Sequence, residues 1–331
     1  MAEIVGSGLT DSRADAAAGR AGIWRDGWIA SLAWLAAAAI TIGLPDVIPW
    51  GSRDLFAGLL LGGAALFALL TAATWRRGGP GERLRHAGPW FIALGVWLAL
   101  WELSTAKLGW LPKPFFSPPQ GLLHVYVTDW QRLGICVLYT LRLWSIGFAA
   151  GVAVGFVIGV GLGWSKRFAY WGMPVLKLIG PVPASAWIPC TFFFPTTFHA
   201  SLFLVGLASG IPVIILTAAG VQQVSRAFYD VARTLGATER FLVLKVAIPA
   251  ALPNVFVGLF MGLYASFAVL VVAEMLGAKY GLGWYLQFQT AYSAYVNVYA
   301  ALIIIALLCA GLVKLLFMVR DHVLDWQKGI L

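Results

Sequence analysis

The chain has 331 residues, of which 60% are apolar and only 11% are charged, and its mean hydropathy is +0.84. A soluble domain carries about 25% charged residues, so this composition predicts that lipid is the solvent for most of the chain. The net charge of +9 does not indicate a nucleic-acid partner, because the basic residues form no single patch interleaved with aromatic side chains. The three cysteines lie far apart, and with no ligand spacing among them we expect no metal site.

Long apolar runs define the expected membrane spans. Most of them approach the ~20 residues that a helix needs to cross a bilayer. The predicted fold is therefore an all-α polytopic membrane protein with eight spans and both termini on one side. The fifth run contains four prolines, which interrupt a regular helix. The runs cover residues 28–44, 55–74, 88–104, 136–164, 172–194, 200–221, 250–276 and 298–319.

The distribution of Lys and Arg predicts the orientation of these spans. Fifteen fall in the loops and tails on one side, five fall on the other, and three lie within apolar runs. Basic residues are enriched in cytoplasmic loops, so both termini and the 222–249 loop are predicted to be cytoplasmic.

Four glycines recur at four-residue intervals in the span 136–164. On a helix they share one face, and the missing side chains let another helix approach closely. We favour packing within the chain, with a subunit interface as the alternative. The residues are Gly151, Gly155, Gly159 and Gly163.

The proline-broken fifth run contains Pro183, Trp187 and Pro189. Prolines leave backbone carbonyls unpaired, and lipid cannot satisfy them, so broken helices occur where protein or a water-filled cavity faces them. One interpretation is that the segment lines a translocation pathway with Trp187 near its gate. The other is a kinked packing helix with Trp187 at an interface.

The polar loop 222–249 has the pattern of two short helices. Ser225 is positioned to cap a first helix that ends at Gly236, and Thr238 to cap a second, with Pro249 opening the next span. A compact two-helix knob between two spans suits docking to a soluble partner.

Glu274 is a carboxylate at the end of the run 250–276. Carboxylates within membrane spans are candidates for a transport pathway. A solvated or capped carboxylate at the end of the span is the alternative.

The loop also resembles a known sequence pattern. Asp230-Val231-Ala232, Gly236 and Val246-Ala247-Ile248-Pro249 keep the spacing of the cytoplasmic EAA loop of bacterial ABC-importer permeases. From about residue 112 onward the chain is similar to permeases of the nitrate/sulfonate/bicarbonate/taurine group, although Thr191–His199 departs from that group's pattern. The further matching motifs are Thr140-Leu141-Arg142, Gly180-Pro181-Val182-Pro183, Ala186-Trp187-Ile188-Pro189, Pro249-Ala250-Ala251-Leu252-Pro253, Ala273-Glu274-Met275-Leu276-Gly277 and Gly281-Leu282-Gly283.

The resemblance implies a division of the chain. A type I permease core of six helices would cover residues 88–331, with the coupling loop at 222–249. Residues 28–87 would form an added transmembrane hairpin and basic cytoplasmic loop, and residues 1–27 a cytoplasmic tail. In this family's pattern the residues that couple to the ATPase correspond to Asp230, Ala232, Arg233, Leu235, Gly236 and Ala237.

The resemblance also implies partners and a mechanism. The chain would work in the bacterial inner membrane as a homodimer, with two cytoplasmic ABC ATPases and an external substrate-binding protein. It would carry a small solute, such as a sulfonate, nitrate or bicarbonate anion, by alternating access. It has no GxxxxGK[ST] motif, so ATP and Mg²⁺ are expected on the partner ATPase, and we expect no cofactor and no catalytic residue in this chain.

Two other functions are the alternatives. An ion-gradient-driven secondary transporter would favour several ionisable groups in the middle of the membrane and would not need a cytoplasmic knob. A regulatory membrane subunit would place the function in the N-terminal hairpin.

Overall fold

The computed structural model describes residues 24–76, 81–111 and 114–326, so the predicted N-terminal tail lies outside it up to residue 23. The described residues are helical, with no strand among them. They divide into two compact units, one formed by residues up to Asp129 with Ser293–Ala300, the other by Trp130–Tyr292 with the remainder of the chain.

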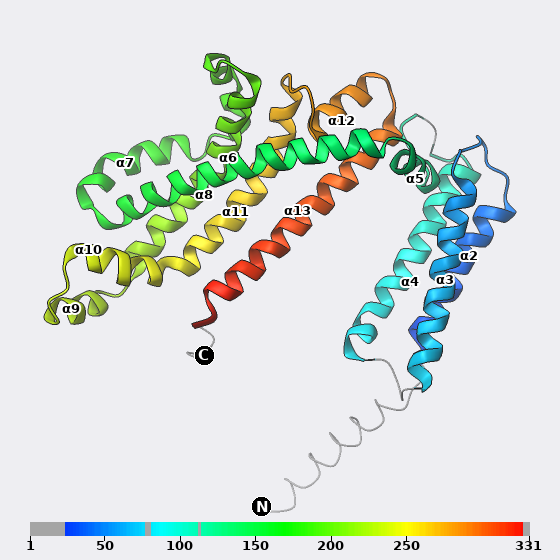
Figure 1. Ribbon diagram of the computed structural model, residues 1–331, viewed down its shortest axis with the longest axis horizontal. Coiled ribbons are helices and arrows are strands. Elements are labelled where there is room, and N and C mark those ends of the chain that lie inside the picture. The colour runs from blue at the N-terminus through cyan, green and yellow to red at the C-terminus, as the bar shows by residue number, and fades with distance from the viewer. Residues whose placement is uncertain (1–23, 77–80, 112–113, 327–331) are drawn as a thin grey trace, which may run out of the picture. The chain divides into compact units, whose positions relative to one another are not determined.

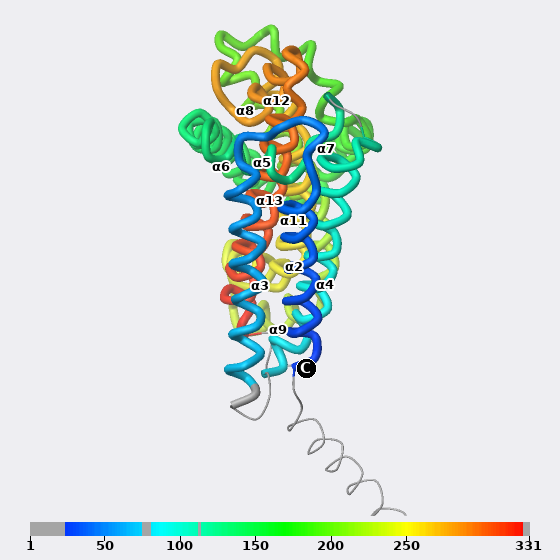
Figure 2. Tube along the Cα trace, turned by 90° about the vertical axis from the view of Figure 1, so that its right-hand side faces the viewer, coloured from blue at the N-terminus to red at the C-terminus, as the bar shows by residue number. Residues whose placement is uncertain are grey.

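The first unit is built on three helices that lie side by side (Figures 1 and 2). Ala37 and Ala38 of α2 (Arg25–Gly43) pack against Phe56 and Leu60 of α3 (Arg53–Arg76). The unit also includes Ser293–Ala300, which contain the start of α13 (Tyr295–Val323). Its helices are α2 (Arg25–Gly43), α3 (Arg53–Arg76), α4 (Glu82–Glu102), the π-helical turn η1 (Leu103–Lys107) and α5 (Pro119–Thr128).

Helix α4 belongs to this unit by its packing. The Trp34 indole of α2 donates a hydrogen bond to the carbonyl oxygen of Phe91 over 3.0 Å, and Leu98 and Ala99 pack against the α2–α3 cluster. The predicted hairpin of α2 and α3 therefore continues into a three-helix arrangement with α4. The boundary at residue 88 remains a prediction.

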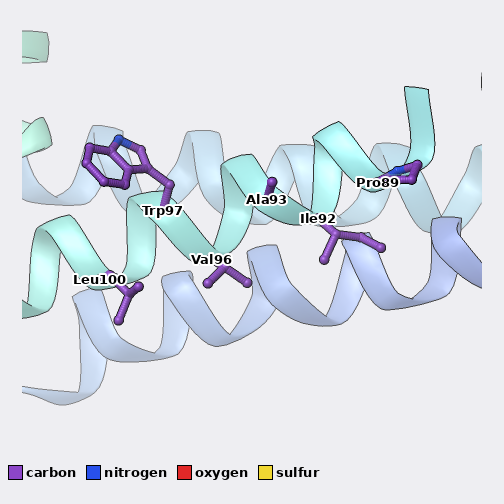
Figure 3. A pocket seen from close by; sticks show the side chains of 6 residues that line it. All are labelled: Pro89, Ile92, Ala93, Val96, Trp97 and Leu100. Atoms are coloured by element: carbon purple, nitrogen blue, oxygen red, sulfur yellow. The ribbon is translucent and has the colours of Figure 1, made fainter. Parts of the chain in front are cut away.

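An apolar groove of about 430 Å³ runs along α4 (Figure 3). Its lining is almost wholly hydrocarbon. The lining residues are Pro89, Ile92, Ala93, Val96, Trp97 and Leu100.

The second unit is organised around α8, which packs against both α6 and α11. Leu143, Val205 and Leu263, one from each of these helices, belong to one buried cluster. The helices of this unit are α6 (Trp130–Trp164), α7 (Lys166–Ile179), the 3-10 helix η2 (Ala184–Phe193), α8 (Thr197–Gln223), α9 (Arg226–Thr234), α10 (Glu239–Phe241), the π-helical turn η3 (Leu242–Ala247), α11 (Ile248–Met275), α12 (Leu282–Ala291) and most of α13 (Tyr295–Val323).

Seven helices among the described residues are long and apolar enough to cross a membrane. The fifth predicted run, 172–194, is a broken helix, as its prolines predicted. Helices α7 and η2 meet there at an angle of 101°. Pro181 and Pro183 stand at the junction and cannot donate backbone hydrogen bonds, so the helix cannot continue through it.

Together, α7 and η2 nevertheless lead from one end of α8 to the other. Helix α7 follows the end of α6, where the Gln222 amide of α8 donates to the carbonyl oxygen of Leu162 over 3.4 Å. Helix η2 leads to the other end of α8, where the Ser201 hydroxyl donates to the carbonyl oxygen of Ala273. Counted as one broken span, residues 166–193 bring the candidate spans among the described residues to eight, the number that the sequence predicted.

Candidate functional site

The loop between α8 and α11 forms a compact knob, here defined as residues 225–247. Helix α9 ends in a left-handed turn at Gly236, whose φ is +81°. The Gly236 N–H donates to the Arg233 carbonyl over 2.9 Å, and the Ala237 N–H donates to the Ala232 carbonyl over 3.0 Å. These two bonds are the Schellman arrangement, in which glycine takes the left-handed position without the steric cost of a Cβ.

The predicted caps of the two knob helices behave differently. The Thr238 hydroxyl accepts a hydrogen bond from the Phe241 N–H, as expected for an N-cap. The expected Ser225 cap is wrong in its side chain, because Ser225 precedes α9 but makes no capping hydrogen bond.

The second knob helix is not a separate short element. Helices α10, η3 and α11 form one continuous helix from Glu239 to Met275, so Pro249 lies inside it and does not open a new span. A proline ring clashes with the carbonyl four residues earlier and offers no N–H. The π-helical turn Leu242–Ala247 ends two residues before Pro249, and its wider winding accommodates the proline without ending the helix.

Tyr229 anchors the knob to the rest of the unit. Its ring packs edge-on against the Trp164 ring at the end of α6, with 5.5 Å between centroids. Both rings lie against the buried cluster of Val221, Ala247 and Ala251. Burial raises the pKa of the Tyr229 phenol above its ordinary value, so the hydroxyl stays neutral at physiological pH.

The opposite face of α9 is apolar and exposed. Phe228, Val231 and Leu235 are exposed by 62%, 61% and 83% of their surface. They stand at positions i, i+3 and i+7 and therefore share one side of the helix. Because this segment lies outside the apolar spans, such a stripe is the kind of surface that a protein partner covers.

The residues predicted to couple to an ATPase lie together on this knob. Asp230, Arg233, Leu235 and Gly236 are exposed, whereas Ala232 and Ala237 are half-buried. Arg233 forms an ion pair with Glu239 across the Gly236 turn, with 3.1 Å between nitrogen and oxygen. Both side chains are more than half exposed, so this pair fixes geometry more than it adds stability.

The candidate pathway residues of the broken span lie on η2 or directly before it. Pro183 and Pro189 are exposed, and Trp187 is half-buried with its indole N–H accepted by no described residue. The helix is of the 3-10 type over ten residues, a length at which that geometry is uncommon. The pathway role of these residues remains a prediction.

Glu274 is not a solvated carboxylate at the end of its span. It is fully buried, and its two oxygens accept hydrogen bonds from the Thr140 hydroxyl and the Gly283 N–H, each over 2.7 Å. Thr140 in turn accepts from the Leu282 N–H over 2.9 Å. The carboxylate therefore ties together α6, α11 and the start of α12, and we call these residues the Glu274 junction.

The Glu274 junction was missed as a unit by sequence reasoning, although each part stands in a matched motif. Position 281 requires a glycine for two reasons. The φ of Gly281 is +132°, and a Cβ there would lie 2.6 Å from the Glu274 carboxyl carbon. The signal that could have found it is the coincidence of a buried acid with a threonine and two closely spaced glycines.

The four glycines of α6 all face α8. A Cβ on Gly155 would lie 2.7 Å from the Gly210 carbonyl oxygen, and one on Gly159 would lie 2.7 Å from the Thr217 Cβ. Gly151 and Gly163 meet Gly206 and Val221 in the same way. The two helices thus approach to backbone contact within one chain.

A polytopic helical membrane protein with an exposed apolar knob between two of its spans has the parts of a transport permease. Residues 151–325 match the family of binding-protein-dependent transport system inner membrane components. The chain belongs to this family and is the membrane-spanning permease of an ABC importer in the inner membrane.

Named relatives extend the match beyond that segment. The chain is 28% identical over 254 residues to the nitrate import permease protein NrtB of Synechococcus elongatus, covering 74% of this chain and 89% of the relative. It is 30% identical to NrtB of Synechocystis, covering 68% and 83%, and 30% identical to the putative aliphatic sulfonates transport permease protein SsuC of Escherichia coli, covering 61% and 77%.

Among solved structures, an inward-facing form of the MetNI methionine ABC transporter aligns with 56% of this chain and 94% of its own, at 17% identity and a TM-score of 0.48.

Proposed function

We propose that the knob of residues 225–247 is the surface on which a cytoplasmic ABC ATPase docks. The observation that carries the proposal is the exposed stripe of Phe228, Val231 and Leu235 on a segment outside the spans. The Schellman turn at Gly236 fixes the angle between α9 and α10, and Tyr229 seats the knob on α6. Motion of a bound ATPase would thus reach the spans, and nucleotide and Mg²⁺ would be held by that partner.

We further propose that two copies of this chain, two ATPases and an external binding protein form the working importer, with the knob and both termini in the cytoplasm. The fifteen-to-five distribution of basic residues supports this orientation. Transport would proceed by alternating access.

The cargo we propose is a small oxyanion of the nitrate or sulfonate type. The support is the similarity to permeases named for nitrate and for aliphatic sulfonates. Cells that express the complete importer should accumulate labelled nitrate or a short alkanesulfonate, and cells without this chain should not. Uptake of neither anion by the complete importer would contradict this cargo class.

The docking role is tested at Gly236. Nothing lies within 4 Å of the position a Cβ would take there, so substitutions act through the backbone and not through crowding. A valine disfavours the left-handed turn by about 1–2 kcal/mol, and asparagine adopts it far more readily. Gly236→Val should therefore bind the ATPase about tenfold more weakly, since about 1.4 kcal/mol corresponds to that factor, while Gly236→Asn stays close to the parent.

The measurement is ATPase affinity and cargo-stimulated ATP hydrolysis with purified, reconstituted complexes. Insertion and assembly of the permease should be normal in both variants, because the spans are packed elsewhere. Equal ATPase affinity and equal coupled hydrolysis in the two variants would remove the coupling role from the knob.

A further inference from the structure

The first unit contains a buried polar layer directly beyond its apolar cluster. On each contributing helix a polar side chain stands three residues from a member of that cluster, on the same helical face. The pairs are Ala38 with Thr41, Phe56 with Arg53, Ala99 with Glu102, and Leu123 with Gln120.

Lys107 lies in this layer, and acceptors on α2 and in the loop that follows it use all three protons of its ammonium group. The ammonium group donates to the carbonyl oxygens of Thr41 and Leu44 over 2.8 and 2.9 Å, and it also donates to the Asp46 carboxylate. An ammonium group has three protons, so none is left for a further acceptor. These bonds fasten the loop between α2 and α3 to the end of α4, and the Val47 N–H adds a bond to the Ala106 carbonyl over 2.9 Å.

Glu102 lies next to this arrangement without a donor of its own. Its side chain is 1% exposed, and the Lys107 nitrogen is 3.9 Å from its nearer oxygen, beyond hydrogen-bond distance. Neither oxygen accepts a hydrogen bond from any described residue, and the buried Gln120 amide is likewise without a bond to the described chain. A buried carboxylate is strongly disfavoured as an anion unless donors surround it, so this geometry suits a neutral carboxyl group.

The other charged groups near Glu102 are held in place. Arg53 donates to the carbonyl oxygens of Thr41, Ile42 and Leu44 and lies 3.8 Å from Asp46. From α5, the His124 ring shares a hydrogen bond with the Ser52 hydroxyl over 3.1 Å. Lys107 is the one cation among the described residues that lies within 4 Å of both Asp46 and Glu102.

We propose that Glu102 is a proton-binding site, and that its proton controls how the α2–α3 loop is attached. With the proton bound, Lys107 keeps its bonds to the Thr41 and Leu44 carbonyls and to Asp46, and the loop is fastened. When Glu102 releases the proton to solvent, its anion requires a donor, and Lys107 moves from Asp46 toward Glu102. The loop residues 44–52 then lose their main attachment to α4.

The experiment reports on the loop through Val47, which is 60% exposed. Val47→Cys is introduced into full-length protein lacking its native cysteines and reconstituted in lipid, and its alkylation rate is followed from about pH 5 to about pH 9. Thr238→Cys on the knob, measured in parallel, corrects for the rise of thiolate with pH. The corrected rate should be low and flat in acid and rise several-fold in alkali.

Variants assign the change to Glu102. Glu102→Gln should hold the corrected rate at its low value throughout, and Asp46→Asn should raise it at every pH. Glu82→Gln, an exposed glutamate on the same helix, is the matched control and should keep the parent's profile. His124→Gln should also keep the profile.

Several outcomes would overturn the proposal. One is a parent profile that is flat after correction, a result that needs no variant to fold. Another is an unchanged profile in Glu102→Gln. A corrected rate that depends on sodium against potassium at fixed pH would assign a metal cation, and not a proton, to Glu102. A profile abolished by His124→Gln would move the titrating group to α5.

Discussion

The Glu274 carboxylate connects three helices of the second unit through two short hydrogen bonds. Thr140 lies 134 positions away in the sequence, and Gly283 only nine. Each oxygen accepts one hydrogen bond, so both oxygens are satisfied locally although the side chain is fully buried. The arrangement therefore holds the start of α12 against α6 and α11, and a role in the pathway remains a separate prediction.

Replacement of Glu274 should measure this structural role. Glu274→Ala strands the Thr140 hydroxyl and the Gly283 N–H in a buried site, and each stranded donor costs about 1–3 kcal/mol. Glu274→Gln keeps one acceptor and should lose less. In detergent, the unfolding temperature should be highest for the parent, lower for Glu274→Gln and lowest for Glu274→Ala. Glu239→Gln, at an exposed site, should unfold at the parent's temperature.

A different outcome would point to transport. If Glu274→Ala unfolded at the same temperature as the parent yet abolished uptake, the carboxylate would act on cargo or gating and not as a structural tie.

At the scale of elements, α6 and α8 approach as closely as their glycines permit. Gly155→Leu would press a side chain against the Gly210 backbone carbonyl, which has no rotamer by which to move away. Overpacking of this kind costs about 1–3 kcal/mol. We expect a lower unfolding temperature in detergent and less assembled permease in the membrane.

Gly134→Leu is the matched control, since it lies on the same helix with nothing within 4 Å of its Cβ position. Its unfolding temperature should stay near that of the parent. Equal effects of the two leucines would show that helix propensity or lipid exposure, and not the contact with α8, determines the result.

The elements show what the sequence could and could not predict. The turn at Gly236 was predictable because a glycine turn at the end of a helix is determined by residues that are neighbours in the sequence. The merging of α10 with α11 was not, because Pro249 is typical of a helix start and only the π-helical turn before it lets the helix run on. The Glu274 junction and the Glu102 layer depend on residues brought together by the packing of separate helices, which composition and spacing do not encode.

At the scale of the whole molecule, the broken span determines which ends of the second unit share a side. Thr197 begins α8 and Thr238 lies on the knob beyond its other end. With the predicted orientation, Thr197→Cys should react with an impermeant thiol reagent in intact cells, and Thr238→Cys should react only after lysis. Both are made in a background without the native cysteines. Labelling of Thr238→Cys in intact cells would reverse the orientation and place the knob away from any cytoplasmic ATPase.

The unbroken helix from Glu239 to Met275 has a mechanical consequence. At 1.5 Å per residue, its 37 residues form a rod about 55 Å long. One end carries the knob and the other carries Glu274. A tilt of about 5° at the knob would displace the far end of such a rod by about 5 Å, roughly one helical turn. The regular winding of the rod is interrupted near the knob by the π-helical turn, and Pro249 and Pro253 remove backbone hydrogen bonds close to it, so we expect this section to set how much of an applied push arrives at the Glu274 junction.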